Sequence, residues 1–223
     1  PGWMLLSYGK KVSVSSSLEG YPAENIVDED ARTAWVAQSN RDMEWAQVDL
    51  QRLSSIHAIQ VNFDEYGANQ KGAVSGVYQS YLIYASVNGE DWSLVVDYGT
   101  KKTDTPHDYI EFEEPFKARY IKLQNKEYMV SENFSVRDLR IFGKGQGSTP
   151  RAVNDFTVER DEADPCKARL CWEAVPDAQG YIVRYGIAGD KLYNNFQVMG
   201  ENTLEIGSLN KGVAYYFTID AYN

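Results

Sequence analysis

The sequence has few of the residues on which several common functions depend. Of its 223 residues only two are cysteine and two are histidine, and 22 Lys and Arg stand against 32 Asp and Glu, which gives a net charge of -10. A zinc site of the usual kind would lack ligands. A strongly acidic chain also repels nucleic-acid phosphates and anionic membrane surfaces. Neutral or cationic partners are therefore expected.

Long hydrophobic runs and catalytic motifs are missing as well. No apolar run approaches the roughly 18–20 residues of a membrane-spanning helix, and the start at Pro1 is unlike a signal sequence. If the protein is secreted, to the periplasm, the cell surface or beyond, we expect its signal to lie outside this sequence. No nucleophile elbow, phosphate loop or HExxH motif occurs. Carboxylates are abundant, but sequence alone does not place two acids across a cleft.

The two cysteines, Cys166 and Cys171, are expected to be unpaired. An extended run between them would separate them by more than the ~7 Å limit for a disulfide. They also have opposite parity in that run. His107, which precedes Asp108 at the start of a predicted strand, is expected to be a hydrogen-bonded turn residue rather than a catalytic base.

Aromatic residues are plentiful, with 16 Tyr, 5 Trp and 8 Phe, and their excess favours strands over helices. Short runs of alternating apolar and polar residues recur in the first two thirds of the chain, a pattern typical of a β-sandwich or barrel. These runs are residues 12–15, 45–50, 59–63, 81–87, 109–112 and 120–123. Asn88-Gly89 predicts a tight hairpin turn between strands 81–87 and 92–96.

A tract of Gly, Ser and Pro from Gly143 to Pro150 marks a linker. We therefore predict a first domain at residues 1–143, a linker at 144–150 and a second domain at 151–223. Strand-like runs return after the linker, at 156–158, 168–172, 181–185, 203–206 and 215–219. The sequence thus predicts an all-β protein with two domains.

Residues 21–35, with the sequence YPAENIVDEDARTAW, resemble the first-loop motif of the discoidin, or coagulation-factor 5/8 type C, domain. Five further motifs follow in the family's order, at residues 45–50, 59–63, 81–92, 118–123 and 138–143. The resemblance implies an eight-stranded jelly roll.

The second domain is similar to a fibronectin type III domain. Trp172 lies where that family has its strand B tryptophan, and Tyr215 matches the tyrosine-corner residue. The chain stops at Asn223, where strand G would be expected. This order of modules resembles the C-terminal accessory region of bacterial family 43 glycoside hydrolases of gut Bacteroidetes.

The loop Asn25-x-x-Asp28-x-Asp30-x-x-Thr33 gathers oxygen donors of the kind that calcium prefers. In discoidin-type carbohydrate-binding modules such a loop often holds a structural Ca2+, and the resemblance places Asp138 as the acidic residue that completes the shell. The alternative is a solvated acidic turn in which Asp30 and Thr33 cap backbone groups.

Trp35, Trp45, Trp92 and Trp172 lie in strand motifs, so they are expected in the core. Sugar recognition needs aromatic rings in loops, beside groups that hydrogen-bond to hydroxyls, and residues 38–44, 64–80 and 126–135 offer that mixture. Related modules bind ligands among the loops at one end of the jelly roll. Each candidate could instead be an exposed loop residue without a ligand. The residues expected to bind carbohydrate are Arg41, Tyr66, Tyr78, Tyr128, Asn133 and Phe134.

These observations predict a non-catalytic carbohydrate-binding and spacer unit of a larger secreted polysaccharide-degrading glycoside hydrolase of the xylosidase or arabinosidase type. Its partners would be a polysaccharide or oligosaccharide and the catalytic domain of the same polypeptide. Two alternatives stay open. One is adhesion to a protein or membrane, which polar loops on an acidic domain disfavour. The other is a structural module that packs on a catalytic domain through Trp3, Met4 and Leu5.

Overall fold

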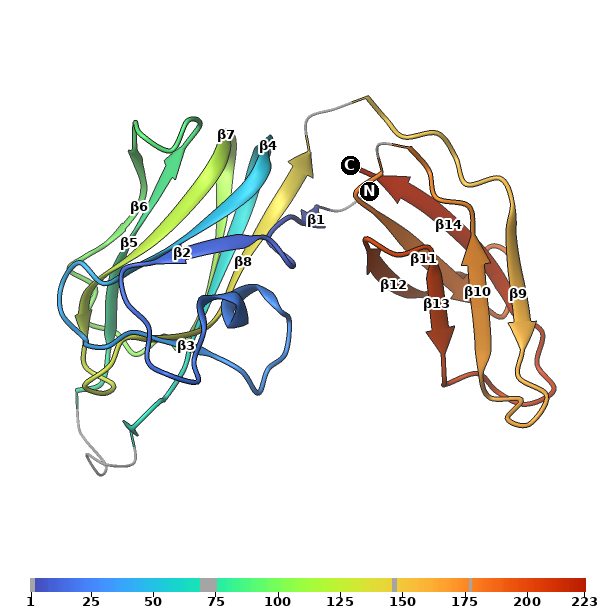
Figure 1. Ribbon diagram of the computed structural model, residues 1–223, viewed down its shortest axis with the longest axis horizontal. Coiled ribbons are helices and arrows are strands. Elements are labelled where there is room, and N and C mark those ends of the chain that lie inside the picture. The colour runs from blue at the N-terminus through green and yellow to red at the C-terminus, as the bar shows by residue number, and fades with distance from the viewer. Residues whose placement is uncertain (1–2, 69–75, 146–147, 177) are drawn as a thin grey trace. The chain divides into compact units, whose positions relative to one another are not determined.

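The computed structural model describes residues 3–68, 76–145, 148–176 and 178–223 (Figure 1). The chain forms two compact units, Pro1–Gln146 and Gly147–Asn223, and each has a hydrophobic core of its own. The predicted all-β class is confirmed, since strands dominate both units and one short 3-10 helix, η1 (Ala23–Val27), accompanies them. In these ranges no helix is long and apolar enough to cross a membrane.

The first unit contains eight strands that pair into one antiparallel sheet. Across it the order is β1-β8-β4-β7-β5-β6, while β2 pairs with β4 and β3 pairs with β8. The strands are β1 (Met4–Leu5), β2 (Lys11–Val14), β3 (Trp35–Val36), β4 (Trp45–Phe63), β5 (Gln79–Ser86), β6 (Ser93–Tyr98), β7 (His107–Tyr128) and β8 (Ser135–Gly145).

Strands β4 and β7 are long because both run through the two layers of the jelly roll. Residues 45–49 of β4 pair with β2 and β7, whereas residues 54–63 pair with β7 and β8, and the register shifts between Asp49 and Ser54. Gln51, within this interruption, has a φ of 66°, which is uncommon outside glycine. Such irregularities bend a strand and increase its twist. The sheet therefore folds over at residues 50–53.

This bend brings both ends of β4 to the end of β7. Trp45, the first residue of β4, pairs with Gln124 of β7. Asp64, directly after β4, has a carbonyl that accepts a hydrogen bond from the Tyr128 hydroxyl at the last position of β7. The segments 37–44, 64–68, 76–78 and 129–134 therefore meet at one end of the unit, which we call the loop end.

The part of the first unit's core that lies directly beneath the loop end is built from aromatic rings. Trp35, Tyr81, Tyr128 and Phe134 are among its largest fully buried side chains. The Phe63 ring lies 5.3 Å from that of Tyr81 and 6.0 Å from those of Tyr128 and Phe134, between centroids. Because each such ring buries roughly 150–250 Å², this cluster holds the ends of the strands that carry the loops.

The predicted hairpin is confirmed, since β5 and β6 flank Asn88-Gly89 and Gly89 has a φ of +83°. Every predicted run of the first domain overlaps a strand, although Ser15 and Val87 lie one residue beyond β2 and β5. Runs 45–50 and 59–63 are nevertheless parts of the single strand β4, and runs 109–112 and 120–123 are parts of β7. Met4 and Leu5, suggested above as a contact for a catalytic domain, form β1 and pair with β8 of their own sheet.

The second unit contains two three-stranded antiparallel sheets around a shared core, of order β13-β10-β9 and β12-β11-β14. Ala168, Leu170 and Trp172 of β10 are buried together, as their shared parity predicts. The Tyr215 hydroxyl accepts a hydrogen bond of 3.1 Å from the backbone N–H of Asn210. The strands are β9 (Phe156–Arg160), β10 (Ala168–Trp172), β11 (Gly180–Gly186), β12 (Asn194–Met199), β13 (Thr203–Ile206) and β14 (Tyr216–Tyr222).

The predicted linker, residues 144–150, begins two residues too early. Strand β8 continues to Gly145, which pairs with Ser54 of β4, so Lys144 and Gly145 belong to the sheet. Glycine marks the end of this strand rather than the start of a free segment. Cys166 and Cys171 are both free thiols, as predicted.

The bend of β4 is fastened to β7 by a bidentate ion pair. Arg119 Nε and Nη2 lie 2.8 and 2.9 Å from the two carboxylate oxygens of Asp49, which also accepts a hydrogen bond from the Gln51 N–H. The hydrogen bonds from Arg119 lower the pKa of Asp49. Because a lowered folded-state pKa stabilises the fold above the unfolded value and the benefit is lost as pH falls through the folded value, this pair stabilises the bend at neutral pH.

Replacing the arginine by Arg119→Met is expected to lower the free energy of unfolding at pH 7 by more than the control variant below does, because a partly buried carboxylate loses a charged donor. The difference from the unmodified protein should shrink at pH 3, below the ordinary aspartate pKa of about 3.9, where Asp49 begins to be protonated. Denaturant unfolding at the two pH values measures both effects. Arg52→Met, at an exposed arginine of the same bend, is the control and should change stability by less than about 0.5 kcal/mol. An equal loss at both pH values would show that the ion pair does not hold the bend.

Candidate functional site

Three asparagines fasten the loops of the loop end to one another. The Asn40 side-chain amide donates to the carbonyls of Tyr128 and Ser131, at 3.2 and 2.8 Å. Asn125 is fully buried and donates to the carbonyls of residues 40 and 41, at 2.8 and 2.9 Å. Asn133 donates to the Ala37 carbonyl at 2.9 Å. The loops are thus held in one conformation by bonds to their backbones.

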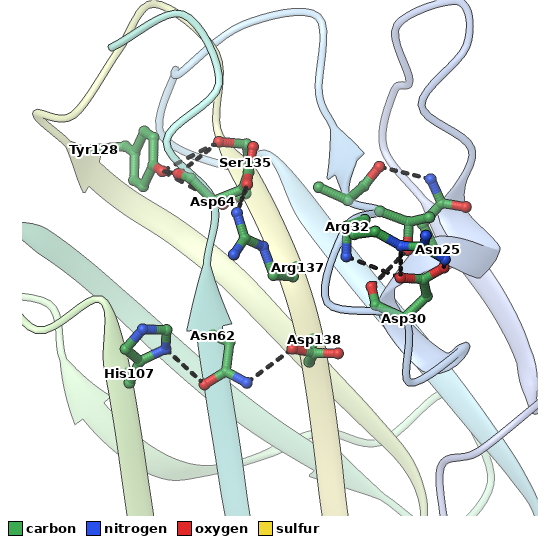
Figure 2. A network of polar contacts seen from close by, with 12 residues as sticks. Asn25, Asp30, Arg32, Asn62, Asp64, His107, Tyr128, Ser135, Arg137 and Asp138 are labelled. Carbon is green, nitrogen blue, oxygen red and sulfur yellow. Dashed lines mark hydrogen bonds and ion pairs between the residues drawn. The ribbon is translucent and has the colours of Figure 1, made fainter. Parts of the chain in front are cut away.

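The segment that follows β4 is fixed in the same way. Figure 2 shows Asp64 surrounded by Tyr128, Ser135 and Arg137. The Tyr128 and Ser135 hydroxyls donate to the Asp64 carbonyl, and the Arg137 guanidinium pairs with its carboxylate. Burial raises the pKa of the Tyr128 hydroxyl above its ordinary value, so this group remains a proton donor at any physiological pH.

The prediction that Tyr128 and Phe134 bind carbohydrate is wrong. Tyr128 and Phe134 are 1% and 0% exposed, and their rings lie 5.3 Å apart, edge to face. Strand β7 continues as far as Tyr128, so the predicted loop is shorter than residues 126–135, and both rings point into the core. They support the loops from beneath and do not face solvent.

The other four candidates remain predictions, and the structure places them at the loop end. Arg41 is exposed on the segment that Asn125 anchors, and Asn133 is partly exposed. The Tyr66 ring packs edge to face against Tyr21, with 4.9 Å between centroids. The Tyr78 hydroxyl donates to Glu127 at 2.7 Å. Residues 69–75 of the predicted loop 64–80 lie outside the described residues.

The predicted calcium loop is closed by its own hydrogen bonds. Asp28 accepts bonds from the Asp30 N–H and the Thr33 hydroxyl, at 2.9 and 2.8 Å, and Asn25 donates to the carbonyl of residue 34 at 2.8 Å. The bidentate hydrogen bonds from Arg32 hold the pKa of Asp30 at about 2. This arrangement matches the alternative of a capped acidic turn.

Asp138, predicted to complete the calcium shell, lies on β8 and faces β4. Its carboxylate accepts a bond of 2.8 Å from the side-chain amide of Asn62, and the oxygen of that amide lies 3.1 Å from His107 Nδ1 (Figure 2). Because an amide oxygen only accepts, Nδ1 of His107 carries the proton. The expectation of a hydrogen-bonded His107 is confirmed, although it begins strand β7 rather than lying in a turn.

The five predicted metal ligands do not fit a calcium ion as they are arranged. Within residues 3–68, 76–145, 148–176 and 178–223, no three Asp, Glu, His or Cys side chains converge to hold a metal. Asp30 would have to leave Arg32, and Asp138 would have to leave Asn62. We therefore derive no role for calcium from this loop.

The sequence profile of the F5/8 type C domain matches residues 11–138. The chain belongs to the F5/8 type C domain family. Lactadherin of Rattus norvegicus is 33% identical over 110 residues, which are 46% of this chain and 25% of that protein. Lactadherin of Mus musculus is 32% identical over 110 residues, 46% of this chain and 23% of that protein. The chain thus spans about a quarter of the length of these relatives.

Two solved structures show the same fold as the F5/8 type C unit. Chitosan-binding module 2 of a chitosanase/glucanase from Paenibacillus sp. IK-5, in complex with chitotriose, has a TM-score of 0.53 and 20% identity, and the match covers 62% of this chain and 99% of that one. The family 32 carbohydrate-binding module of NanJ from C. perfringens, in complex with galactose, has a TM-score of 0.50 and 18% identity, and the match covers 63% of this chain and 98% of that one.

Sequence reasoning placed two tryptophans of the F5/8 type C unit wrongly. Trp35 and, in the second unit, Trp172 are buried as predicted, but Trp45 and Trp92 are partly exposed and outside the core. A signal was available for Trp45, because it shares its parity in β4 with the polar Gln47 and Asp49, while residues 46, 48 and 50 point inward. Tyr21, the partner of Tyr66, and Lys102 and Glu127, the partners of Tyr78, were also missed, since each is distant in sequence from the tyrosine that it contacts.

A test of the acidic loop follows from its closure. We expect the thermal midpoint of the F5/8 type C unit to differ by less than about 1 °C between protein in excess chelator and protein in millimolar Ca2+. Calcium binding at a hundred times its Kd would stabilise the fold by about 2.7 kcal/mol, which corresponds to a rise of several degrees. Differential scanning calorimetry makes the comparison, with Mg2+ as the control for ionic strength. A rise of several degrees in the thermal midpoint with Ca2+ but not with Mg2+ would show that this loop binds calcium.

Proposed function

We propose that the F5/8 type C unit is a carbohydrate-binding module whose site lies at the loop end. The observation that carries the proposal is that exposed Arg41 and the ring of Tyr66 stand on segments that buried side chains tie to the core. Tyr78 directly precedes β5, and its carbonyl accepts a hydrogen bond from the Met129 N–H. Sugar rings stack on aromatic faces, and polar groups beside those faces bind the hydroxyls. Loops that are already ordered lose little conformational entropy on binding. Chains of the same fold solved with chitotriose and with galactose support this function.

Tyr78 illustrates how such a ring is held ready. Its hydroxyl donates to Glu127 at 2.7 Å and accepts from Lys102 at 2.9 Å, and the Lys102 ammonium lies 4.3 Å from the ring centroid. Lys102 also pairs with Glu127. The ring is therefore fixed at its polar edge while the side chain remains partly exposed. A single shallow site of this kind is expected to bind weakly.

The second unit serves in this proposal as a spacer of the fibronectin type III kind. Its sheets, β13-β10-β9 and β12-β11-β14, have the arrangement expected of strands E-B-A and C′-C-F. Trp172 in β10 and the Tyr215 hydroxyl bond to the Asn210 N–H support this assignment. The whole chain would then be a non-catalytic part of a secreted polysaccharide-degrading hydrolase of the xylosidase or arabinosidase type. Its binding would raise the effective concentration of the substrate for the catalytic domain.

Titration with xylan and arabinan oligosaccharides, and with chitotriose and galactose, tests the loop-end site. We expect amide chemical-shift changes in segments 37–44, 64–68, 76–78 and 129–134. Tyr66→Ala and Tyr78→Ala should each weaken binding about tenfold, because the loss of one stacking partner corresponds to about 1.4 kcal/mol. Tyr193→Ala, at a tyrosine of the second unit that is 79% exposed, is the matched control and should bind normally. Unchanged loop signals with every sugar at tens of millimolar would overturn the proposal.

A further inference from the structure

One layer of the F5/8 type C unit carries aromatic rings on its outer face, away from the core. Strands β2, β4, β7, β5 and β6 lie side by side there, and the register places Ser13, Gln47, Lys122, Tyr84 and Leu94 in one row across them. A parallel row contains Trp45, Gln124, Leu82 and Asp97, and another contains Lys11, Asp49, Tyr120 and Ser86. We call the partly exposed group of Trp45, Tyr84, Trp92 and Tyr120 around Lys122 the aromatic face.

Lys122 stands at the centre of the aromatic face and is held by rings rather than by a carboxylate. Its ammonium lies 4.1 Å from the centroid of Trp92 and 5.3 Å from that of Tyr84. Burial among these side chains lowers its pKa. Cation–π contacts orient the ammonium but leave its hydrogen-bond donors free for an acceptor.

The two cations that flank Lys122 along β7, Arg119 and Lys126, are each paired with a carboxylate. Arg119 binds Asp49 at 2.8 Å, and Lys126 binds Asp42 at 2.6 Å. In the part of the chain that the structure describes, no carboxylate lies within ion-pair distance of Lys122, although acidic residues outnumber basic ones by 32 to 22. The centre of the aromatic face therefore carries an uncompensated positive charge on an acidic protein.

We infer that the aromatic face is a second carbohydrate-binding surface and that it selects glycans carrying a carboxylate, that is, glycans with uronic acid residues. This inference rests on the proposed function, because it assigns a further surface and a substrate class to the same module. The exposed parts of Trp45 and Trp92 would stack against the apolar faces of sugar rings. The Lys122 ammonium would donate to the carboxylate, in a charge-assisted hydrogen bond.

The dimensions and the surroundings of the face suit a short stretch of polysaccharide. From Gln47 to Tyr84 the row crosses two strand spacings, roughly 10 Å, and Gln47 and Gln124 place amides beside Lys122 and Trp45. The face also adjoins the loop end, because Trp45 follows directly on segment 37–44. Met43, within that segment, is 65% exposed. A polysaccharide bound near Arg41 would thus continue across Trp45 toward Lys122.

The net charge of -10 does not oppose this selectivity at contact distance. Screening by salt limits the reach of surface charges to about 8 Å at physiological ionic strength. A carboxylate at the aromatic face therefore senses mainly Lys122 and the pairs around it. Since Asp49 is already bound by Arg119, Lys122 provides the unpaired charge at the centre of the face, and exposed Lys11, opposite Asp49, adds a cation at its edge.

Two oligosaccharides that differ only in the acidic group test the inference: xylotetraose with one glucuronic acid branch, and the same compound with the carboxylate of that branch reduced to a primary alcohol. We expect the full chain to bind the acidic compound at least fivefold more tightly, and the acidic compound to shift the amide signals of residues 45–49, 82–86, 92–94 and 120–124. Lys122→Met keeps the stem of the side chain and removes its charge, so it should abolish the preference and leave neutral binding unchanged. Trp92→Ala should weaken the binding of the acidic compound severalfold.

Lys144→Met, at an exposed lysine of β8 outside the row, removes the same charge elsewhere and should keep the preference. Equal affinity for the two compounds, or an unchanged preference in Lys122→Met, would overturn the inference and leave Lys122 as a packing residue. Should a variant not fold, the unmodified protein still decides, because acidic-compound shifts confined to the loop end contradict a second surface. If the proposed function itself is wrong, the amide signals of the loop end should not shift with either compound.

Discussion

The shared bend of β4 and β7 is the constraint on which the rest of the first unit depends. A sheet that stayed straight would carry the two ends of β4 far apart, since 19 residues at about 3.3 Å each span roughly 60 Å. The interruption between Asp49 and Ser54 folds the sheet over, and Arg119 ties Asp49 to β7 at that point. Segments 37–44 and 64–68, which lie at opposite ends of β4, thereby become neighbours at the loop end.

The aromatic residues of this unit do two separate jobs, and strand parity divides them. Phe63, Tyr128 and Phe134 point inward and form the base on which the loops rest. Trp45 and Tyr84 point outward from the strands of the same unit, beside polar neighbours. A composition rich in Tyr, Trp and Phe therefore indicates strands in general, whereas the face on which each ring lies depends on its register.

Local signals in the sequence predicted much of the fold, and tertiary signals were harder to interpret. Asn88-Gly89 specifies a turn through backbone preferences, and the parity of Ala168, Leu170 and Trp172 specifies a buried face, so both predictions succeeded. The bend at residues 50–53 carries no Gly or Pro, and the ion pair beside it, from Asp49 to Arg119, joins residues 70 positions apart. For that reason one bent strand was interpreted as two.

The candidate site shows the same limit at the level of single side chains. A loop composition rich in oxygen donors was compatible with a metal site and with a capped turn, and only the structure shows the partner of each donor. Asp30 is bound by Arg32, only two residues away, so this pairing could have been predicted from the sequence. Asp138 is bound by Asn62 from another strand, and nothing local indicates that pairing. Tyr128 and Phe134 were assigned to a loop by sequence position, yet the core beneath the loops requires their rings.

Charge pairing links these observations, because many cations of the first unit are matched one to one with acids. Arg32, Arg119, Lys126, Arg137 and Arg140 each have a carboxylate partner at hydrogen-bond distance. Such pairs fix loops and bends but leave little field at a distance, since their charges cancel locally and salt screens the remainder. Net charge therefore describes the protein as seen by a distant partner. A ligand in contact is selected by the groups that the fold leaves unmatched, and on the outer sheet face the unmatched cation at the centre is Lys122.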